Sequence, residues 1–361
     1  METDPNNTLT FRCAVIGVGK PTHTWAKGGG HQIGYAHART YLANPRCSLV
    51  SGADINPENL AAFQKKWDVE QGFEDYREML ATAKPDIVSI CTYVGLHRDM
   101  VLACADAGVK GILLEKPALH SPKAIIEIDE ALSRTGMKLC VAHVRRHLPN
   151  FRRIRELIEA GRIGRPLLFA AGIDGWDLSE WGGHWLDAFR YFNGDRPVEW
   201  VMGQGRVRDA RGYGHAMEDH GLCVFEFDNK ARGLLDGGKA LGAETEDRPT
   251  LTILGETGAL YLRDWVERLE LVSRNGNETF IESAGENGET DDNTWAPWLQ
   301  SMVDWLDGGT PPLTAWEQCR GSMELNLAAY VSMLRSDRMD LPFDAEAIKL
   351  DEWPVELLRK P

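Results

Sequence analysis

The sequence predicts a two-domain protein of the α/β and α+β classes. An N-terminal doubly wound parallel sheet is followed by a domain with a large, mostly antiparallel open sheet flanked by helices. The chain has 361 residues, more than a single hydrophobic core usually supports. Short apolar runs alternate with amphipathic segments as far as residue 142, and longer alternating strands follow residue 165. We place the domains at 1–145 and 146–361. The C-terminal helix of the second domain could pack against the first domain.

The first domain is predicted from apolar runs that are continuous rather than alternating. Strands buried on both faces of a parallel sheet have this pattern, and helical crossovers between them wind the sheet twice. The predicted strands are 12–18, 47–54, 86–92, 110–115 and 138–143, and the helices include 58–67, 73–83, 97–108 and 121–136. This alternation is typical of a Rossmann-type domain.

The second domain is predicted from strands separated by turn signals. Asp228-Asn229 and the Gly-Glu-Thr-Gly run at 255–258 are hairpin turns between apolar strands. The expected strands are 165–173, 198–207, 220–238, 249–264 and 268–283, with helices over 149–161, 296–309 and 315–337. An antiparallel sheet follows from this order, and the acidic, glycine-rich 283–294 is a surface loop.

Composition excludes several classes of partner. The formal charge of −14 would repel a polyanion, so we expect no nucleic acid partner. The arginines of residues 144–157 are spaced like a solvated helix face, from which one arginine could reach a ligand. A polar N-terminus and the lack of any long apolar run favour a cytoplasmic protein without membrane contact. Seven scattered cysteines without a CxxC pair indicate buried free thiols and no metal site.

A nucleotide-binding loop is indicated at the end of the first strand. Gly17 and Gly19 would let the backbone approach a pyrophosphate, and Asp54 ends the second strand, where a carboxylate accepts ribose hydroxyls. No arginine follows Asp54 to bind a 2′-phosphate, so NAD is favoured over NADP. The alternative for Asp54 is a turn carboxylate before Pro57.

Two further segments carry groups for proton transfer. Glu115, Lys116 and Pro117 follow a parallel strand, at the edge where such sheets bind ligands, unless they are only its solvated tip. Residues 182–190 predict a helix with His184 in its first turn and Asp187 on the same face. A histidine beside carboxylates and a lysine can move a proton off a hydroxyl. The nearby tryptophans suit either sugar stacking or core packing; they are Trp176, Trp181 and Trp185.

From about Phe11 to Pro342 the chain resembles the Gfo/Idh/MocA oxidoreductases, the relatives of glucose–fructose oxidoreductase and inositol dehydrogenase. The residues that carry the resemblance are Gly17-x-Gly19, Asp54, Cys-Thr-Tyr-Val-Gly-Leu-His at 91–97, Glu-Lys-Pro at 115–117, Arg145-Arg146 and the 182–190 run. The family pattern G-x-x-H-A recurs at 34–38. The nucleotide-binding fingerprint is therefore one motif, interrupted between Gly19 and Gly34.

The resemblance implies roles for individual residues. Lys116 matches the catalytic lysine, His184 the catalytic histidine, and Glu115 the residue that orients the nicotinamide ribose. Asp187 matches an aspartate that contacts polyol hydroxyls. The implied cofactor contacts are Gly17, Gly19, Gly34, Asp54, Thr92, His97, Glu115 and Lys116.

The chain also departs from the family pattern. Glu180 replaces the family's aspartate four residues before the histidine, which leaves its role open, and Tyr93 replaces a proline. Our substrate-binding candidates are Glu180, Asp187, Arg146, Trp181 and Trp25.

The insertion at Lys20–Ile33 must leave from the ligand-binding edge of the sheet. We expect it to form a wall of the substrate pocket, with Trp25 or His23 near the ligand. The alternatives are a subunit contact, a disordered flap, and a zinc site built from His23, His31 and His37.

These residues predict an NAD-dependent dehydrogenase acting on a secondary alcohol of a sugar, sugar derivative, glycoside or cyclitol. Two alternatives remain. One is a redox-neutral hydrolase or lyase that holds NAD tightly and passes through a 3-keto glycoside; the other is an NAD-sensing regulator without turnover. By resemblance, a homodimer or homotetramer would form through the C-terminal sheet.

Overall fold

A computed structural model describes most of the chain. The described residues are 10–21, 32–174, 177–207, 210–211, 215–238, 249–282, 294–344, 348 and 358. The chain divides into two compact units. The first unit comprises 1–115, 127–142 and 295–315, and the second comprises 116–126, 143–294 and 316–361.

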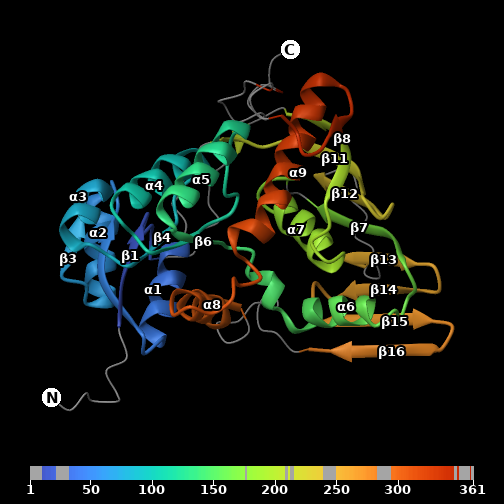
Figure 1. Ribbon diagram of the computed structural model, residues 1–361, viewed down its shortest axis with the longest axis horizontal. Coiled ribbons are helices and arrows are strands. Elements are labelled where there is room, and N and C mark those ends of the chain that lie inside the picture. The colour runs from blue at the N-terminus through green and yellow to red at the C-terminus, as the bar shows by residue number, and fades with distance from the viewer. Residues whose placement is uncertain are drawn as a thin grey trace. The chain divides into compact units, whose positions relative to one another are not determined.

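The first unit contains a parallel sheet of six strands in the order β3-β2-β1-β4-β5-β6 (Figure 1). Its strands are β1 (Phe11–Ile16), β2 (Cys47–Ala53), β3 (Gln71–Phe73), β4 (Ile87–Ile90), β5 (Gly111–Leu114) and β6 (Lys138–Val141). All residues of β4 and β5 are buried, as their continuous apolar runs predict. The predicted doubly wound sheet is confirmed; the short edge strand β3 was not predicted.

Helices cover both faces of this sheet. They are α1 (Ile33–Ala43), α2 (Pro57–Trp67), α3 (Tyr76–Ala83), α4 (Val94–Asp106), α5 (Pro122–Thr135) and α8 (Ala296–Leu306). In Figure 1, α1 and α8 lie on one face and α3 and α4 on the other. Helix α2 begins where Asn56 accepts hydrogen bonds from the Glu58 and Asn59 amides, with Pro57 at the first helical position.

The second unit contains a mixed sheet of nine strands in the order β16-β15-β14-β13-β7-β12-β11-β8-β17. The strands are β7 (Pro166–Asp174), β8 (Val198–Arg206), β11 (His220–Phe227), β12 (Arg232–Gly238), β13 (Leu251–Gly255), β14 (Gly258–Arg263), β15 (Arg268–Ser273), β16 (Gly276–Ile281) and β17 (Met339–Asp340). Among the strand pairs that the described residues form in this sheet, only β7 and β12 are parallel. Strands β9 (Ala210–Arg211) and β10 (His215–Ala216) form a separate pair. The predicted hairpin turns therefore join real strands.

The pleat of the large sheet gives it two different faces. One register-paired row is buried: Val201, Phe225, Gly233, Phe169, Ile253, Leu260 and Leu271. The neighbouring row points the other way: Met202, Val224, Leu234, Ala170, Thr252, Tyr261 and Glu270. Helices cover the first face, and the second contains half-buried and exposed side chains.

The helices of the second unit carry the candidate site. They are η1 (Val144–His147), α6 (Pro149–Glu159), α7 (Gly182–Phe192) and α9 (Trp316–Arg335). Helices α7 and α9 pack together, and α9 also packs against β8. Within the described part of the chain, we find no helix whose length and apolar character would suit a membrane crossing.

Candidate active site

The predicted cofactor residues lie at one edge of the parallel sheet. The residue directly after β1 is Gly17, after β2 it is Asp54, and after β5 it is Glu115. Thr92 is the second residue after the end of β4. Open α/β sheets bind ligands at this edge. The geometry therefore agrees with the predicted location of the dinucleotide.

Two glycines bring backbone segments into close approach at this edge. Gly17 has φ +79°, and an added Cβ would lie 2.7 Å from the Thr92 methyl. An added Cβ on Gly34, in the first turn of α1, would lie 2.6 Å from the carbonyl oxygen of Val18. Helix α1 therefore starts directly against the end of β1, which is the packing that the third fingerprint glycine provides. The residues on both sides of the insertion behave as one motif.

Asp54 fastens the loop that follows β1. Its Oδ2 accepts from the Gly19 amide and its Oδ1 from the Asn56 amide, each at 2.9 Å. A carboxylate has about four acceptor positions, so both oxygens keep capacity for ribose hydroxyls. The pair of roles explains why an aspartate suits this position.

Glu115 belongs to a buried polar network in the first unit. His37 Nε2 lies 3.1 Å from Glu115 Oε1, and His37 Nδ1 lies 2.7 Å from Ser89 Oγ. The Tyr41 hydroxyl lies 2.7 Å from the same Ser89 oxygen. Both ring nitrogens of His37 thus lie within hydrogen-bonding distance of Glu115 or Ser89. His23 and His31, the other residues of the alternative zinc site, lie outside the described residues.

The remaining cofactor candidates lie at the start of α4. His97 is buried, and its Nε2 lies 2.9 Å from the Thr92 carbonyl oxygen. Thr92 donates from Oγ1 to the Met100 sulfur at 3.3 Å. His97 thus fixes the backbone that carries Thr92, and direct contact of either residue with a cofactor stays a prediction.

Lys116 and Glu180 meet in the second unit. The Lys116 Nζ donates to the Glu180 carbonyl oxygen at 3.2 Å and lies 3.4 Å from its Oε2. The lysine side chain is 21% exposed and that of Glu180 is 9% exposed. Glu180, whose role the family pattern leaves open, thus contacts the candidate catalytic lysine and limits the orientations of its amino group.

His184 lies in the first turn of α7, close enough to Lys116 for their charges to interact. Burial lowers the pKa of His184 well below its usual value, and the positive charges of Arg145 and Lys116 lower it further. The imidazole is therefore neutral at neutral pH and can accept a proton. Its Nδ1 is buried without a hydrogen-bond partner among the described residues.

Two further residues lie near His184: Arg145, which the sequence indicated only as part of the Arg145-Arg146 pair, and Trp265, which the sequence did not single out. The Arg145 guanidinium lies 5.2 Å from the ring centroids of both Trp181 and Trp265. Trp181 also packs 6.2 Å from His184. Trp265 comes from the turn between β14 and β15 and has φ +65°, a strained backbone for a bulky residue. Such strain occurs at functional sites.

Arg146 and Asp187 form a buried ion pair rather than an open binding surface. Arg146 donates from Nε and Nη2 to the two Asp187 oxygens at 2.8 and 2.7 Å. It is 1% exposed and also lies 2.9 Å from Asp195. Ser322 donates to Asp187 Oδ1 at 2.8 Å. The contacts of Arg146 and Asp187 with substrate stay predictions, and this geometry gives both residues a structural role.

A possible ligand cluster adjoins this pair. One ligand atom each from His143, Asp187 and Cys319 lie within 4.8 Å of one another. Burial raises the pKa of the Cys319 thiol well above its usual value, so the sulfur keeps its proton. The Arg146 cation already neutralises Asp187. This arrangement does not favour a metal ion.

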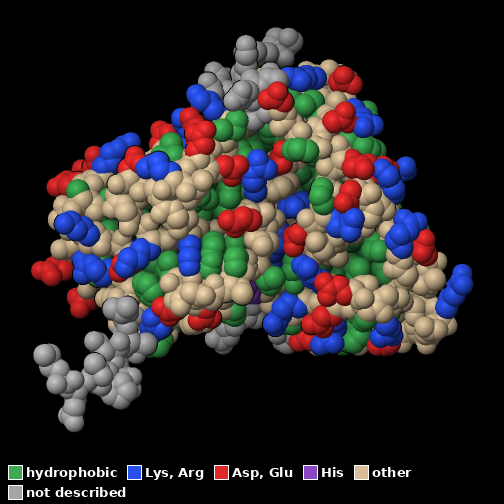
Figure 2. Space-filling model, in the orientation of Figure 1, with side chains coloured by type: hydrophobic (Ala, Val, Ile, Leu, Met, Phe, Trp, Pro, Cys, Tyr) green, Lys and Arg blue, Asp and Glu red, His purple; other side chains and the backbone are tan. Residues whose placement is uncertain are grey.

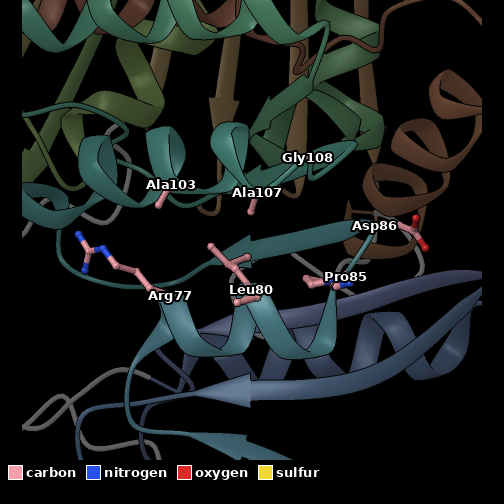
Figure 3. A pocket seen from close by; sticks show the side chains of 9 residues that line it. Arg77, Leu80, Pro85, Asp86, Ala103, Ala107 and Gly108 are labelled. Atoms are coloured by element: carbon pink, nitrogen blue, oxygen red, sulfur yellow. The ribbon is translucent and has the colours of Figure 1, made fainter.

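A hollow of about 510 Å³ lies elsewhere in the first unit. Figure 3 shows it between α3, with Arg77 and Leu80, and the C-terminal end of α4, with Ala103 and the residue directly after the helix, Ala107. Pro85 and Asp86 precede β4, so the hollow is at the opposite edge of the sheet from Gly17 and Asp54. It is not the site assembled above.

Several predicted features lie outside the described residues. They include Trp25, Trp176 and residues 22–31 of the insertion.

The face of the molecule drawn in Figure 2 has no stripe of charged side chains of a single sign. Figure 2 shows acidic and basic side chains interspersed over that face. Of the seven cysteines, all free, only Cys47 is not buried.

Comparisons with known proteins agree with this geometry. Residues 11–143 match a family model described as an oxidoreductase family with an NAD-binding Rossmann fold. Residues 151–261 match the GFO/IDH/MocA C-terminal domain. Together the two models span most of the chain, and the first establishes an NAD-binding domain.

Individual relatives are similar over nearly their whole length. The chain is 22% identical to myo-inositol 2-dehydrogenase of Thermotoga maritima, over 90% of this chain and 96% of that one. It is 22% identical to D-glucoside 3-dehydrogenase of Escherichia coli K12, over 87% and 96%. The WlbA dehydrogenase of Bordetella pertussis, solved with NADH and UDP-GlcNAcA, superposes with a TM-score of 0.75 at 21% identity, covering 93% and 100%.

Proposed function

The chain belongs to the Gfo/Idh/MocA oxidoreductase family, and on that premise we propose that it is an NAD-dependent dehydrogenase of a sugar, sugar derivative, glycoside or cyclitol. The substrate group is a secondary alcohol. Relatives named as inositol and glucoside dehydrogenases support the substrate class. The absence of an arginine in the 55–59 segment after Asp54 supports NAD over NADP.

One observation carries the proposal. The Lys116 amino group is held by Glu180 within electrostatic reach of His184, whose imidazole is neutral. A lysine and a neutral histidine together can accept and pass on a single proton. Alcohol oxidation releases one proton for each hydride, so this pair supplies what the reaction requires of the protein.

The residues divide the reaction as follows. Gly17, Gly34 and Asp54 fit the dinucleotide, because two close backbone approaches and a strand-end carboxylate are present together. NAD, when bound, supplies the hydride acceptor. Lys116, as an ammonium group, donates a hydrogen bond to the substrate oxygen. As the alcohol becomes a carbonyl, Lys116 takes up the hydroxyl proton while it passes one of its own protons to the neutral His184 imidazole, which then releases that proton toward solvent. The same groups return the proton in the reverse direction.

The substrate class is tested with a panel of sugars, glycosides and inositols, each offered with NAD and with NADP. Appearance of reduced-cofactor absorbance identifies the dehydrogenase and its substrate. Release of aglycone from a glycoside without bulk NADH would favour the redox-neutral hydrolase or lyase instead. Tight NAD binding without conversion of any compound would favour the regulator.

Asp54→Ala is expected to weaken NAD binding and to reduce the preference of the protein for NAD over NADP. The substitution removes both a ribose acceptor and a charge that repels a 2′-phosphate, and it frees the Gly19 amide. We expect a loss of at least ~10-fold in NAD affinity, in the range of a lost hydrogen bond to a charged group. Titration with both cofactors measures it. A wild-type protein that already prefers NADP would contradict the assignment.

We propose that copies of the chain associate through the outer face of the nine-stranded sheet. Met202, on that face, is 52% exposed, and Leu222, Leu254 and Val272 are between 37% and 41% exposed. Exposed apolar side chains that lie on one sheet suit a self-complementary contact.

Met202→Asp is therefore expected to lower the mass measured by light scattering without lowering the unfolding temperature of the protomer. Burying a carboxylate in an apolar contact is costly. Leu42→Asp is the control, since Leu42 is 51% exposed on α1. An unchanged mass in Met202→Asp, or a monomeric wild type, would reject this interface.

A further inference from the structure

Two carboxylates lie buried beside the turn that precedes α7. Asp177 is 1% exposed and Glu218 is fully buried. The turn, residues 177–181, leads directly to His184, yet the reaction described above uses neither carboxylate. Two neighbouring acids in an interior strongly disfavour carrying both charges.

Glu218 holds the turn by its backbone. Its Oε1 accepts from the Leu178 amide at 2.5 Å, and its Oε2 accepts from the Tyr330 hydroxyl at 3.0 Å. In the described part of the chain, Glu218 forms no ion pair with a lysine or arginine. Among the described residues, a charge on this carboxylate would therefore be buried without a compensating cation.

The turn is fastened at several further points. Asn326 on α9 donates to the Leu178 carbonyl oxygen at 2.8 Å. Asp177 accepts from the Glu180 amide at 3.1 Å through Oδ1, and its carbonyl oxygen accepts from the Gly182 amide at 3.0 Å. Both backbone polar groups of Leu178 are thus anchored by side chains from distant parts of the sequence. The position of the turn depends on these anchors.

The same turn carries the contact to the catalytic lysine. The carbonyl oxygen and carboxylate of Glu180 are the groups that face the Lys116 amino group. Glu180 is two residues from Leu178, so a shift at Leu178 is passed to Glu180 over a short stretch of backbone. The hydrogen bonds of Glu218 go to Leu178 and Tyr330, so we expect its effect on Lys116 to act through the turn.

The charge state of Glu218 follows from its surroundings. Burial, followed by the negative charge of Asp177, raises the pKa of Glu218 to about 8, although the Leu178 amide and the Tyr330 hydroxyl lower it. Cys223 on β11 is also near Glu218, and burial raises the pKa of its thiol to about 12. Burial also raises the pKa of Tyr330. At neutral pH, Glu218 is therefore a neutral acid beside the buried Asp177.

We infer that Glu218 is a positioning residue: its carboxyl group, hydrogen-bonded to Leu178 and Tyr330, holds the 177–181 turn, and through it Glu180 and Lys116, in place for proton transfer. The inference rests on the proposed function. Ionisation of Glu218 would set two buried negative charges side by side and loosen the turn. The active arrangement is therefore lost as the pH rises past the titration of this acid.

Thermal unfolding across pH tests the charge state without any turnover. The unfolded chain ionises Glu218 above about pH 4.5, whereas the folded chain keeps it protonated to about pH 8. The unfolded state then binds fewer protons, so stability falls as pH rises through this window. Glu218→Gln keeps the shape and cannot ionise, and its advantage in Tm over the wild type should grow from pH 5 to pH 8.

The control for this measurement is Glu226→Gln. It removes a carboxylate from the same strand, β11, whose side chain pairs with Arg232 rather than with the turn. The difference in Tm between Glu226→Gln and the wild type is expected not to grow from pH 5 to pH 8. Parallel curves of Tm against pH for the wild type and Glu218→Gln would overturn the inference.

Kinetics test the positioning. One pH unit above the titration midpoint, about a tenth of the Glu218 side chains stay neutral. When kcat of each protein is divided by its own value at pH 7, the wild-type value at pH 9 should therefore be about 10-fold lower than that of Glu218→Gln. Glu218→Ala leaves the Leu178 amide unsatisfied and should lower kcat about fivefold or more at pH 7, the shift expected from one lost hydrogen bond. KM should change little. Wild-type kcat in Glu218→Ala would show that the residue only stabilises the fold, and the inference would fail.

Labelling of Lys116 separates this inference from the proposed function. A small amine-acylating reagent should label Lys116 about fivefold faster in Glu218→Ala than in the wild type, because one anchoring hydrogen bond is lost, and at the wild-type rate in Glu218→Gln. Peptide mass spectrometry measures the rate, with exposed Lys123 as internal reference. Should no substrate be turned over, the proposed function fails, while equal labelling of Lys116 in all three proteins would reject the positioning role by itself.

Discussion

Replacing Lys116 with alanine is expected to lower kcat by at least ~10²-fold, the usual contribution of a general acid–base group. NAD affinity should stay close to that of the wild type. The reason is local: the Lys116 amino group contacts Glu180 and lies within electrostatic reach of the neutral His184 imidazole, whereas the dinucleotide contacts proposed at Gly17 and Asp54 come from another part of the chain. Steady-state kinetics and cofactor titration measure the two quantities separately.

A second substitution separates proton transfer from charge. Lys116→Arg keeps a cation that can still reach Glu180, but a guanidinium does not give up its proton in proteins. The arginine variant should therefore be as impaired in kcat as the alanine variant. Lys123→Ala, seven residues along the chain at an exposed position, should behave like the wild type. Near-normal turnover in Lys116→Ala would remove the lysine from the mechanism.

The parts of the fold that the sequence predicted are those with a strong local pattern. The buried strands β4 and β5, the Asn-Pro start of α2 and the Asp-Asn turn between β11 and β12 each follow from adjacent residues. Strand β3 has only three residues and no apolar run, so pairing with β2 defines it. Helix α8 shows its amphipathic pattern in the sequence but not the fact that it belongs to the first unit, because that depends on contacts distant in sequence.

The residues of the candidate site form the same two groups: those with a local sequence pattern and those that depend on contacts distant in sequence. Lys116 and His184 could be proposed as candidates because each lies in a recognisable motif at a predictable end of a strand or helix. Trp265 lies in a turn without such a motif, and its proximity to Arg145 arises only when β14 and β15 pair. The two adjacent arginines also point to different partners, Arg145 to the tryptophans and Arg146 to Asp187, since η1 turns between them.

Glu180 and Glu218 show what sequence spacing cannot supply. Glu180 departs from the aspartate of the family pattern, which left its role open, and the geometry provides it with a partner in Lys116. Nothing in the sequence distinguishes Glu218 from its neighbour Asp219. Its burial, and hence its charge state, depends on the packing of Leu178 and Tyr330 against it. The chemistry of an acid is set by its surroundings, which a motif does not encode.

Arg146→Ala is expected to be the most destabilising of these substitutions, by about 3–5 kcal/mol in the free energy of unfolding, the cost of breaking a buried ion pair. The guanidinium is 1% exposed and binds Asp187 through two hydrogen bonds. Burial by itself would raise the pKa of Asp187, but Arg146 lowers it to about 2. Without the arginine, a buried carboxylate is left without its main counter-ion.

The pH dependence of this loss gives a second test. In the wild type the folded-state pKa of Asp187 is below its ordinary value of 3.8, so the stabilisation is present above about pH 4 and is lost as the pH falls toward 2. Arg146→Ala should therefore differ from the wild type most at neutral pH and least in acid. Denaturant unfolding at several pH values measures it. Arg196→Ala is the matched control, because the side chains of its ion pair with Asp228 are 48% and 32% exposed, and ion pairs accessible to solvent contribute little. An Arg146→Ala protein with wild-type stability and only a raised KM would instead show that Arg146 binds substrate, as the sequence predicted.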